Sequence, residues 1–245
     1  MQLIHCGGSL SCYCQKMFLL LKTGSVAYWV LVTQKMRVIA GAFKGRRLAA
    51  PKGSRIVRPT TDRVKESVFS ILREQVIDAD FLDLCAGTGS IGIEALSRGV
   101  KHATFLERDP RCIRVIEQNL RTCGLSAEPH TRCLGTGQEP TAKAYLLRRD
   151  AVKGISYLQK QAVVFRIIYF DPPYSKSPEG STELYTTCLT LLADNALLSP
   201  DGTLLVEHAK RSIMPDEIGS LTRNRIASYS DTIVSFYRRN ETWKF

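Results

Sequence analysis

An acid, two prolines and an aromatic residue follow an apolar run in the second half of the chain: Asp171, Pro172, Pro173 and Tyr174 come directly after residues 163–170. The apolar run is typical of a buried β-strand. Two prolines fix φ and remove two backbone donors, so the chain has to leave the sheet in a stiff, extended loop. Ligands bind at the carboxyl edge of open α/β sheets. A carboxylate and an aromatic ring held there could grip a flat ring bearing an amino group, such as a nucleobase; the alternative is a proline-terminated strand with an ordinary capping acid.

A glycine-rich loop after residues 81–85 is the second candidate site. Gly87, Gly89 and Gly92 match the spacing of the dinucleotide-binding motif, and Glu107 ends the next predicted strand. Glycines let the backbone turn tightly and let a ligand approach closely, and the carboxylate could accept both hydroxyls of a ribose. This pattern alone suits either NAD or S-adenosylmethionine (SAM), since both carry an adenosine.

Three further features favour SAM. Asp83 precedes the glycines and could meet the cationic amino group of that cofactor, which a pyrophosphate does not need. Asp150 closes the third predicted strand, where it could bind the adenine amino group. A dehydrogenase has no evident use for the motif that begins at Asp171. The ordinary alternatives stay open, with Asp83 as a helix-capping acid and with Glu107 and Asp150 as surface carboxylates.

The basic charge of the chain is concentrated in one segment. The formal net charge is +11, and residues 36–73 contain ten Lys and Arg residues against two acids, whereas residues 74–245 contain 21 of each sign. A localised excess of this kind indicates a nucleic-acid partner; the alternative is a solvated basic face with no partner. The basic residues of this segment are Arg37, Lys44, Arg46, Arg47, Lys52, Arg55, Arg58, Arg63, Lys65 and Arg73.

Cysteine usage and hydropathy indicate a cytoplasmic protein without a metal. The eight cysteines contain no CxxC pair and match no zinc-ligand spacing, so a reducing compartment is the simpler inference. The apolar runs at 17–21 and 26–32 are too short to span a membrane. Residues 1–35 make a poor signal or transit peptide, and we treat them as an extension of doubtful significance. We expect a monomer.

From residue 81 onward, predicted strands and helices alternate, which is typical of a parallel sheet with helices on both faces. We expect an α/β fold with a doubly wound, mostly parallel sheet that ends in an antiparallel hairpin. Strands are predicted at 81–85, 103–106, 145–149, 163–170, 203–206, 225–229 and 232–238, and helices at 90–98, 110–123, 152–161 and 182–193. In front of this domain, placed at 58–245, we expect a small basic hairpin arm at 36–57. Residues 126–143 have the composition of a long surface loop.

Three motifs resemble those of the Rossmann-like, class I SAM-dependent methyltransferases that act on exocyclic base nitrogens: DLCAGTG at 83–89, FLERD at 105–109 and DPPY at 171–174. The front of the chain narrows the resemblance. It is similar to the RsmD family of small-subunit (16S) rRNA guanine-N2 methyltransferases in MRVIAGAFKGRRL, RPTTDRVKESVFSIL and GSIGIEALSRG, at 36–48, 58–72 and 89–99. The likeness covers nearly all of residues 36–238. Residues 1–35 have no counterpart, and the loop at 126–143 is longer than usual.

This resemblance implies a role for each candidate residue. Asp171 and the Pro172 carbonyl would accept the two N–H groups of the target amine and aim its lone pair at the methyl group, while Tyr174 stacks on the base. The cofactor would be SAM, bound by Asp83, Ala86, Gly87, Gly89, Glu107 and Asp150. The substrate would be ribosomal RNA, within the small subunit or its assembly intermediate, bound by Arg37, Lys44, Arg46, Arg47, Arg58, Arg63 and Tyr174.

Other functions stay open at this stage. DPPY is shared with adenine-N6 methyltransferases, which gives a DNA or RNA adenine-N6 enzyme as one alternative. A non-catalytic ribosome-assembly factor that binds RNA, and a nicotinamide-dependent oxidoreductase, are the alternatives from other classes. The choice of guanine over adenine depends on the front segment, because both bases offer the same amino group. We also expect that residues 36–57 could be removed without loss of SAM affinity, and we interpret Glu207 as structural.

Overall fold

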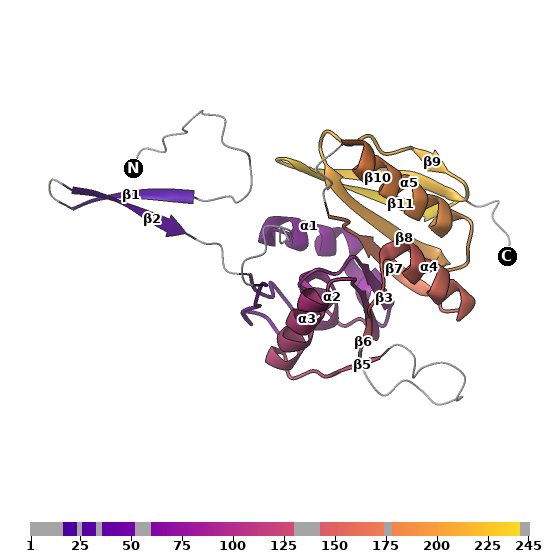
Figure 1. Ribbon diagram of the computed structural model, residues 1–245, viewed down its shortest axis with the longest axis horizontal. Coiled ribbons are helices and arrows are strands. Elements are labelled where there is room, and N and C mark those ends of the chain that lie inside the picture. Colours follow the sequence, from indigo (N-terminus) through magenta and orange to yellow (C-terminus); the bar gives the residue numbers. More distant parts are fainter. Residues whose placement is uncertain are drawn as a thin grey trace.

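The computed structural model describes residues 17–23, 26–32, 36–51, 60–129, 143–173 and 178–240, with the backbone alone for 17–32 and 178–182. Strands β1 (Met17–Thr23) and β2 (Val26–Val32) pair as an antiparallel hairpin. Figure 1 shows this hairpin set apart from the main sheet. The hairpin contains the short apolar runs at 17–21 and 26–32, for which the sequence predicted no strand pairing.

The main sheet has nine strands in the order β5-β6-β4-β3-β7-β8-β11-β10-β9. Neighbouring strands from β5 to β8 are parallel, whereas the β8–β11, β11–β10 and β10–β9 pairs are antiparallel. This confirms the predicted fold class, including the C-terminal hairpin. The strands are β3 (Asp80–Leu84), β4 (His102–Leu106), β5 (Ala127–Pro129), β6 (Ala144–Leu147), β7 (Phe165–Phe170), β8 (Leu198–Ala209), β9 (Glu217–Ile218), β10 (Leu221–Tyr229) and β11 (Thr232–Arg239).

Helices cover both faces of the sheet, as Figure 1 shows. On β3, Phe81 packs in a core with one set of helices, whereas Leu82 and Leu84 pack in a second core with the other set. This division follows from the alternation of side chains along a strand, and it explains why the parallel strands are predominantly apolar. The first set is α1 (Asp62–Leu72), α2 (Ser90–Ser97) and α3 (Pro110–Thr122); the second is α4 (Ala151–Lys160) and α5 (Pro178–Ala193). A 3₁₀ turn, η1 (Arg73–Val76), follows α1.

The chain leaves β3 for α2 and β4, on one side of the sheet, and returns to β7 on the other side of β3. This reversal is the topological switch point, where doubly wound folds place their ligands. The loops after β3, β4 and β7 therefore meet at one edge. None of the helices in the part of the chain that the structure describes is long and apolar enough to cross a membrane.

The predicted front hairpin is present in shortened form. Residues 36–48 turn back on themselves through hydrogen bonds from Val38 N to Arg46 O (2.9 Å) and from Leu48 N to Met36 O (2.9 Å). Within residues 36–51, only Arg37 and Arg47 form a bridge pair, so the hairpin contains no regular strands. The reason is that other backbone groups of this hairpin are bonded to helices of the main domain.

Candidate active site at the carboxyl edge of the sheet

The glycine loop leaves β3 with three residues in the left-handed region. Cys85 has φ 71°, Gly87 56° and Gly89 73°. The N–H groups of Cys85 and Ala86 both donate to Leu106 O at 3.0 Å, which fastens the loop to the end of β4. A left-handed cysteine carries a backbone strain of about 1–3 kcal/mol, and such residues are concentrated at functional sites. The local structure therefore fits a loop built for close approach by a ligand.

Glu107 lies directly beside this loop, at the end of β4. Its Oε2 accepts a hydrogen bond from Gly87 N at 2.8 Å, and its Oε1 accepts from the N–H groups of Arg108 and Asp109, both at 2.8 Å. Three backbone donors thus fix the carboxylate in one orientation while the side chain stays half-buried. A fixed acceptor beside a glycine loop fits the paired hydroxyls of a ribose.

Asp83 is the buried acid of the site, with 3% of the residue exposed. Its Oδ2 accepts a hydrogen bond from Gly92 N at 2.8 Å. Burial raises the pKa of Asp83 to about 7, the Gly92 N–H opposes that rise, and the charge of Glu107 adds to it. A cationic amino group would offset this cost of burial, so the acid fits the amine of SAM better than a pyrophosphate.

The third glycine of the motif has a packing role. A Cβ added to Gly92 would come within 2.4 Å of the Phe105 ring, which lies on β4 beneath α2. The match to the dinucleotide motif therefore extends to helix–strand packing, as in nucleotide-binding α/β folds.

Asp171 follows β7 next to the glycine loop. Its N–H donates to Leu84 O at 3.3 Å, across the β3–β7 pair. Asp171 is half-buried, Pro172 is buried and Pro173 is exposed. The charge of Asp171 is among the causes that raise the pKa of the Cys85 thiol well above its usual range, after burial, Cys188 and Glu107. The structure thus brings Asp83, Gly87, Glu107 and Asp171 to one edge, while Tyr174 lies outside the described residues.

Asp150 occupies the N-cap of α4. Its Oδ1 accepts a hydrogen bond from Lys153 N at 3.0 Å, and its Oδ2 lies 3.7 Å from Lys153 Nζ. This is the capping role of an acid at a helix start. Asp150 follows β6, the neighbour of β4, so it lies at the same edge as the other acids. Its contact with adenine stays a prediction.

The basic residues predicted to bind RNA lie at the surface. Arg37, Lys44, Arg46 and Arg47 on the front hairpin and Arg63 on α1 are all exposed. Arg37 Nε also pairs with Asp62 Oδ2 at 3.1 Å. Arg58 lies outside the described residues. Lys65, by contrast, is fully buried, so its charge is not part of the surface excess.

The front hairpin is fastened to α2 through Glu94. The Glu94 carboxylate accepts hydrogen bonds from Ile39 N (2.7 Å), Ala40 N (3.0 Å) and Arg98 Nε (2.8 Å). Met36, Val38 and Leu48 belong to the buried core on this face. These residues therefore form part of the domain interior, which argues against removal of residues 36–57 without loss of SAM affinity.

Asn119 on α3 joins the hairpin to the glycine loop. Its side chain exchanges hydrogen bonds with Ala49 N (2.7 Å) and Ala49 O (3.1 Å) and also donates to Thr88 O (3.0 Å). Thr88 Oγ1 in turn lies 3.4 Å from Met36 Sδ. Sequence reasoning missed Asn119, although its position three residues after Ile116, on the apolar face of the helix, marks it as a buried polar residue.

Another buried acid, Glu207, lies behind the motif that begins at Asp171. Glu207 on β8 accepts hydrogen bonds from Tyr169 Oη (2.5 Å) and Thr60 Oγ1 (3.2 Å). Burial, followed by the charge of Glu207, raises the pKa of Tyr169 well above its usual range. Tyr169 lies two residues before Asp171, so these contacts support the end of β7. The structural interpretation of Glu207 agrees with this placement.

Comparison with known proteins places the chain among methyltransferases. A family model described as "Conserved hypothetical protein 95" matches residues 36–238. The chain is 36% identical to "Putative rRNA methyltransferase YlbH" of Bacillus subtilis, over 83% of this chain and 99% of the relative. It is 32% identical to "Ribosomal RNA small subunit methyltransferase D" of Haemophilus influenzae, over 72% and 80% of the two chains.

Solved structures agree with this result. "Putative methyltransferase yhhF from Escherichia coli" aligns with a TM-score of 0.66 and 28% identity, over 84% of this chain and 99% of that one. The family model, which matches residues 36–238, covers the front hairpin, the glycine loop and the DPPY motif together. The chain therefore belongs to the Conserved hypothetical protein 95 family, which is the RsmD family that its motifs resemble.

Proposed function

We propose that the protein transfers a methyl group from SAM to ribosomal RNA, and that the acceptor is the exocyclic N2 of a guanine in the small-subunit RNA. The observation that carries the proposal is the position of Asp171, which follows β7 directly beside the glycine loop that follows β3. A methyl-transfer site needs a loop that binds the nucleoside part of the cofactor and a group that binds the acceptor. The glycine loop and the acid of the DPPY motif would supply these two parts at the carboxyl edge of the sheet.

SAM fits the residues present. Glu107, held by three backbone N–H groups, would accept the ribose hydroxyls, and Asp83 would pair with the amino group of the methionine part. The backbone of Ala86, Gly87 and Gly89 would lie against the cofactor, and Asp150 would contact the adenine. The bound cofactor supplies an electrophilic methyl group.

The chain's own contribution is to orient the acceptor and stabilise charge. The lone pair of an exocyclic amino nitrogen is conjugated with the ring and is a poor nucleophile. Hydrogen bonds from its two N–H groups to the Asp171 carboxylate and the Pro172 carbonyl would turn the lone pair toward the methyl group. The nitrogen becomes positively charged as the bond forms, a nearby carboxylate stabilises that charge, and the proton leaves afterwards.

The choice of RNA rests on the front hairpin and on the relatives. Arg37, Lys44, Arg46 and Arg47 are exposed basic residues of the front hairpin, which Asn119 joins to the glycine loop. The relative from Haemophilus influenzae carries the name of a small-subunit RNA methyltransferase. A base has to be unpaired or flipped to reach a pocket of this kind.

The test incubates the protein with labelled SAM and, separately, with small ribosomal subunits, naked small-subunit RNA and DNA, followed by nucleoside mass spectrometry. We expect N2-methylguanosine in the RNA. N6-methyladenosine would contradict the choice of guanine and favour the adenine alternative. Absence of label from all three substrates, together with RNA binding, would favour a non-catalytic assembly factor.

A further inference from the structure

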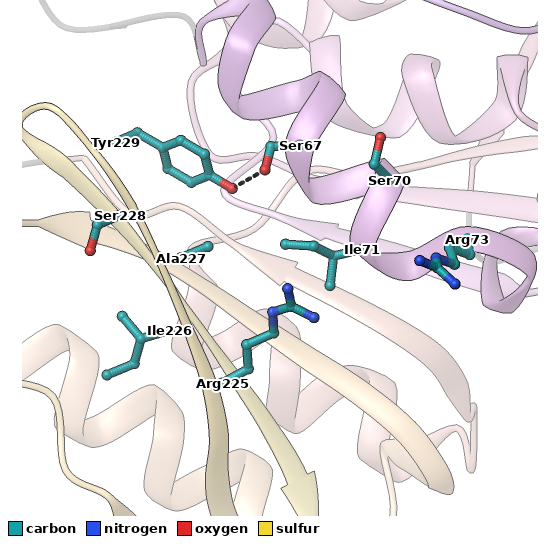
Figure 2. A pocket seen from close by; sticks show the side chains of 9 residues that line it. All are labelled: Ser67, Ser70, Ile71, Arg73, Arg225, Ile226, Ala227, Ser228 and Tyr229. Atoms are coloured by element: carbon teal, nitrogen blue, oxygen red, sulfur yellow. Dashed lines mark hydrogen bonds between the residues drawn. The ribbon is translucent and has the colours of Figure 1, made fainter.

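A groove of about 650 Å³ lies between α1 and β10, away from the glycine loop. Figure 2 shows that Tyr229 and Arg225 point from β10 toward α1, and that Tyr229 Oη is bonded to Ser67 at one end. Ser70 and Arg73 line the opposite wall. The groove is large enough for a chain segment or a drug-sized ligand.

The lining of the groove is basic. Arg73 and Arg225 are both exposed, and they come from opposite walls. Neither arginine pairs with a carboxylate within the described ranges, and no acid lines the groove there. The other polar groups are hydroxyls. Arginine guanidinium groups and hydroxyls are the groups that contact phosphate oxygens in nucleic-acid complexes.

The sheet register relates this groove to Asp171. Arg225 pairs with Phe236 on β11, Phe236 pairs with Leu205 on β8, and Leu205 pairs with Tyr169 on β7, two residues before Asp171. Three strand spacings separate β10 from β7, a distance of about 14 Å. The groove is therefore within reach of a short stretch of RNA whose base lies beside Asp171.

The groove and the candidate cofactor-binding residues lie on opposite sides of β7 in the sheet. The candidate cofactor-binding residues follow β3 and β4, whereas β8, β11 and β10 lie on the other side of β7. A base that enters between the cofactor and Asp171 remains attached to its RNA strand, and that RNA strand has to lie away from the cofactor. The β8–β10 side of the sheet is the side of β7 away from the candidate cofactor-binding residues.

We propose that the α1–β10 groove binds the phosphodiester backbone of RNA next to the target nucleotide, with Arg73 and Arg225 contacting phosphates. This inference rests on the proposed function in that RNA is the substrate. The groove would be a second basic surface in addition to the front hairpin. Helix α1, which carries Arg63, contacts the hairpin and also lines the groove.

The test compares Arg225→Gln with Lys160→Gln, since Lys160 is an exposed residue at the end of α4 on the opposite face and each change removes one positive charge. Binding of naked small-subunit RNA is measured over a range of salt concentrations. We expect Arg225→Gln to weaken binding about five- to tenfold at 0.1 M salt and to reduce the salt slope by about one. Arg73→Gln should do the same, and Lys160→Gln should have no effect.

SAM affinity, measured by calorimetry, and thermal unfolding should be unchanged in all three variants, because the substituted side chains are exposed and distant from the glycine loop. Equal RNA binding by Arg225→Gln and Lys160→Gln would overturn the inference. Dependence on Arg225 with assembled subunits but not with naked RNA would assign the groove to a ribosomal protein and also overturn it. Groove-dependent RNA binding without any methyl transfer by the unmodified protein would uphold the groove and contradict the proposed function.

Discussion

Lys65 and Glu94 form an ion pair in the protein interior, with Nζ and Oε2 4.0 Å apart and neither side chain exposed. Lys65 comes from α1 and Glu94 from α2, and the front hairpin crosses both helices at this point. Lys65 Nζ also donates to Arg37 O, while Glu94 accepts two backbone N–H groups of the same hairpin. One buried pair therefore holds three segments of the chain together.

Replacing Lys65 by methionine should destabilise the protein strongly. The change removes the buried cation from Glu94, which keeps its contact with Arg98, and it leaves Arg37 O without this donor. Removal of one partner of a buried pair costs up to about 3–5 kcal/mol. Urea unfolding checks the loss, with Arg63→Met on the exposed face of α1 as the matched control, for which we expect less than about 1 kcal/mol. Equal stability of the two variants would show that the pair has no such role.

The basic surface of the hairpin can be tested without removing the hairpin. Arg46→Gln with Arg47→Gln should weaken RNA binding and lower the salt slope by about 0.9 for each charge in contact with a phosphate. SAM affinity should not change, because both side chains are exposed. Lys160→Gln with Arg166→Gln removes two charges elsewhere and should leave RNA binding intact. Deletion of residues 36–51, in contrast, should lower both affinities, since Ala49 and Met36 contact Asn119 and Thr88.

Asp171→Asn tests the methyl-transfer chemistry. An amide accepts one fewer hydrogen bond and carries no negative charge, so single-turnover methyl transfer should slow by about 10²–10³-fold, equivalent to about 3–4 kcal/mol in the barrier. SAM affinity should stay near that of the unmodified protein. Asp201→Asn serves as the control. Asp201 is an exposed acid in the amino half of β8, and it pairs with Arg166 on β7. A near-normal rate for Asp171→Asn with intact SAM binding would remove Asp171 from the proposed role.

Asp83 should make stability and cofactor binding depend on pH in opposite ways. Its pKa of about 7 in the folded protein lies above the ordinary value of 3.8, so the folded state holds this proton more tightly than the unfolded state. The stability contributed by this group is therefore present below pH 4 and is lost as the pH rises through 7, by up to about 1.4 kcal/mol per pH unit within that window.

Urea unfolding of the unmodified protein and of Asp83→Asn between pH 5 and pH 8 isolates the contribution of Asp83, because other groups titrate alike in both. SAM affinity should rise over the same range in the unmodified protein, as the ionised acid becomes available to the cofactor's amino group. A SAM affinity that is flat with pH would argue against that contact.

Much of the site could be predicted because its residues follow predicted strands. Asp83, Glu107 and Asp171 end or follow β3, β4 and β7, and the sheet order brings such residues together. The missing parts are contacts over long sequence separations. Asn119 meets Ala49, 70 positions away, and Glu207 meets Thr60, 147 positions away, and no local pattern encodes such pairs.

Contacts between distant parts of the sequence also explain why the packing of the front hairpin was not predicted. Composition showed that residues 36–57 are basic, but the burial of Met36, Val38 and Leu48 depends on the surfaces of α1, α2 and α3, which periodicity alone cannot align. The sequence left Asp150 as either a cofactor contact or a surface carboxylate, and it did not indicate a helix cap. The structure shows the cap, which is the interaction that adjacent residues can make alone.

Asn119 has a consequence for how proteins of this kind could be altered. Its amide fastens Ala49 and Thr88 at once, so the basic front segment and the loop after β3 share one support. The front hairpin therefore cannot be exchanged between proteins independently of α3. A chimaera that takes residues 36–51 from another protein would have to import a compatible α3 as well, or its glycine loop would lose its anchor along with its former neighbour.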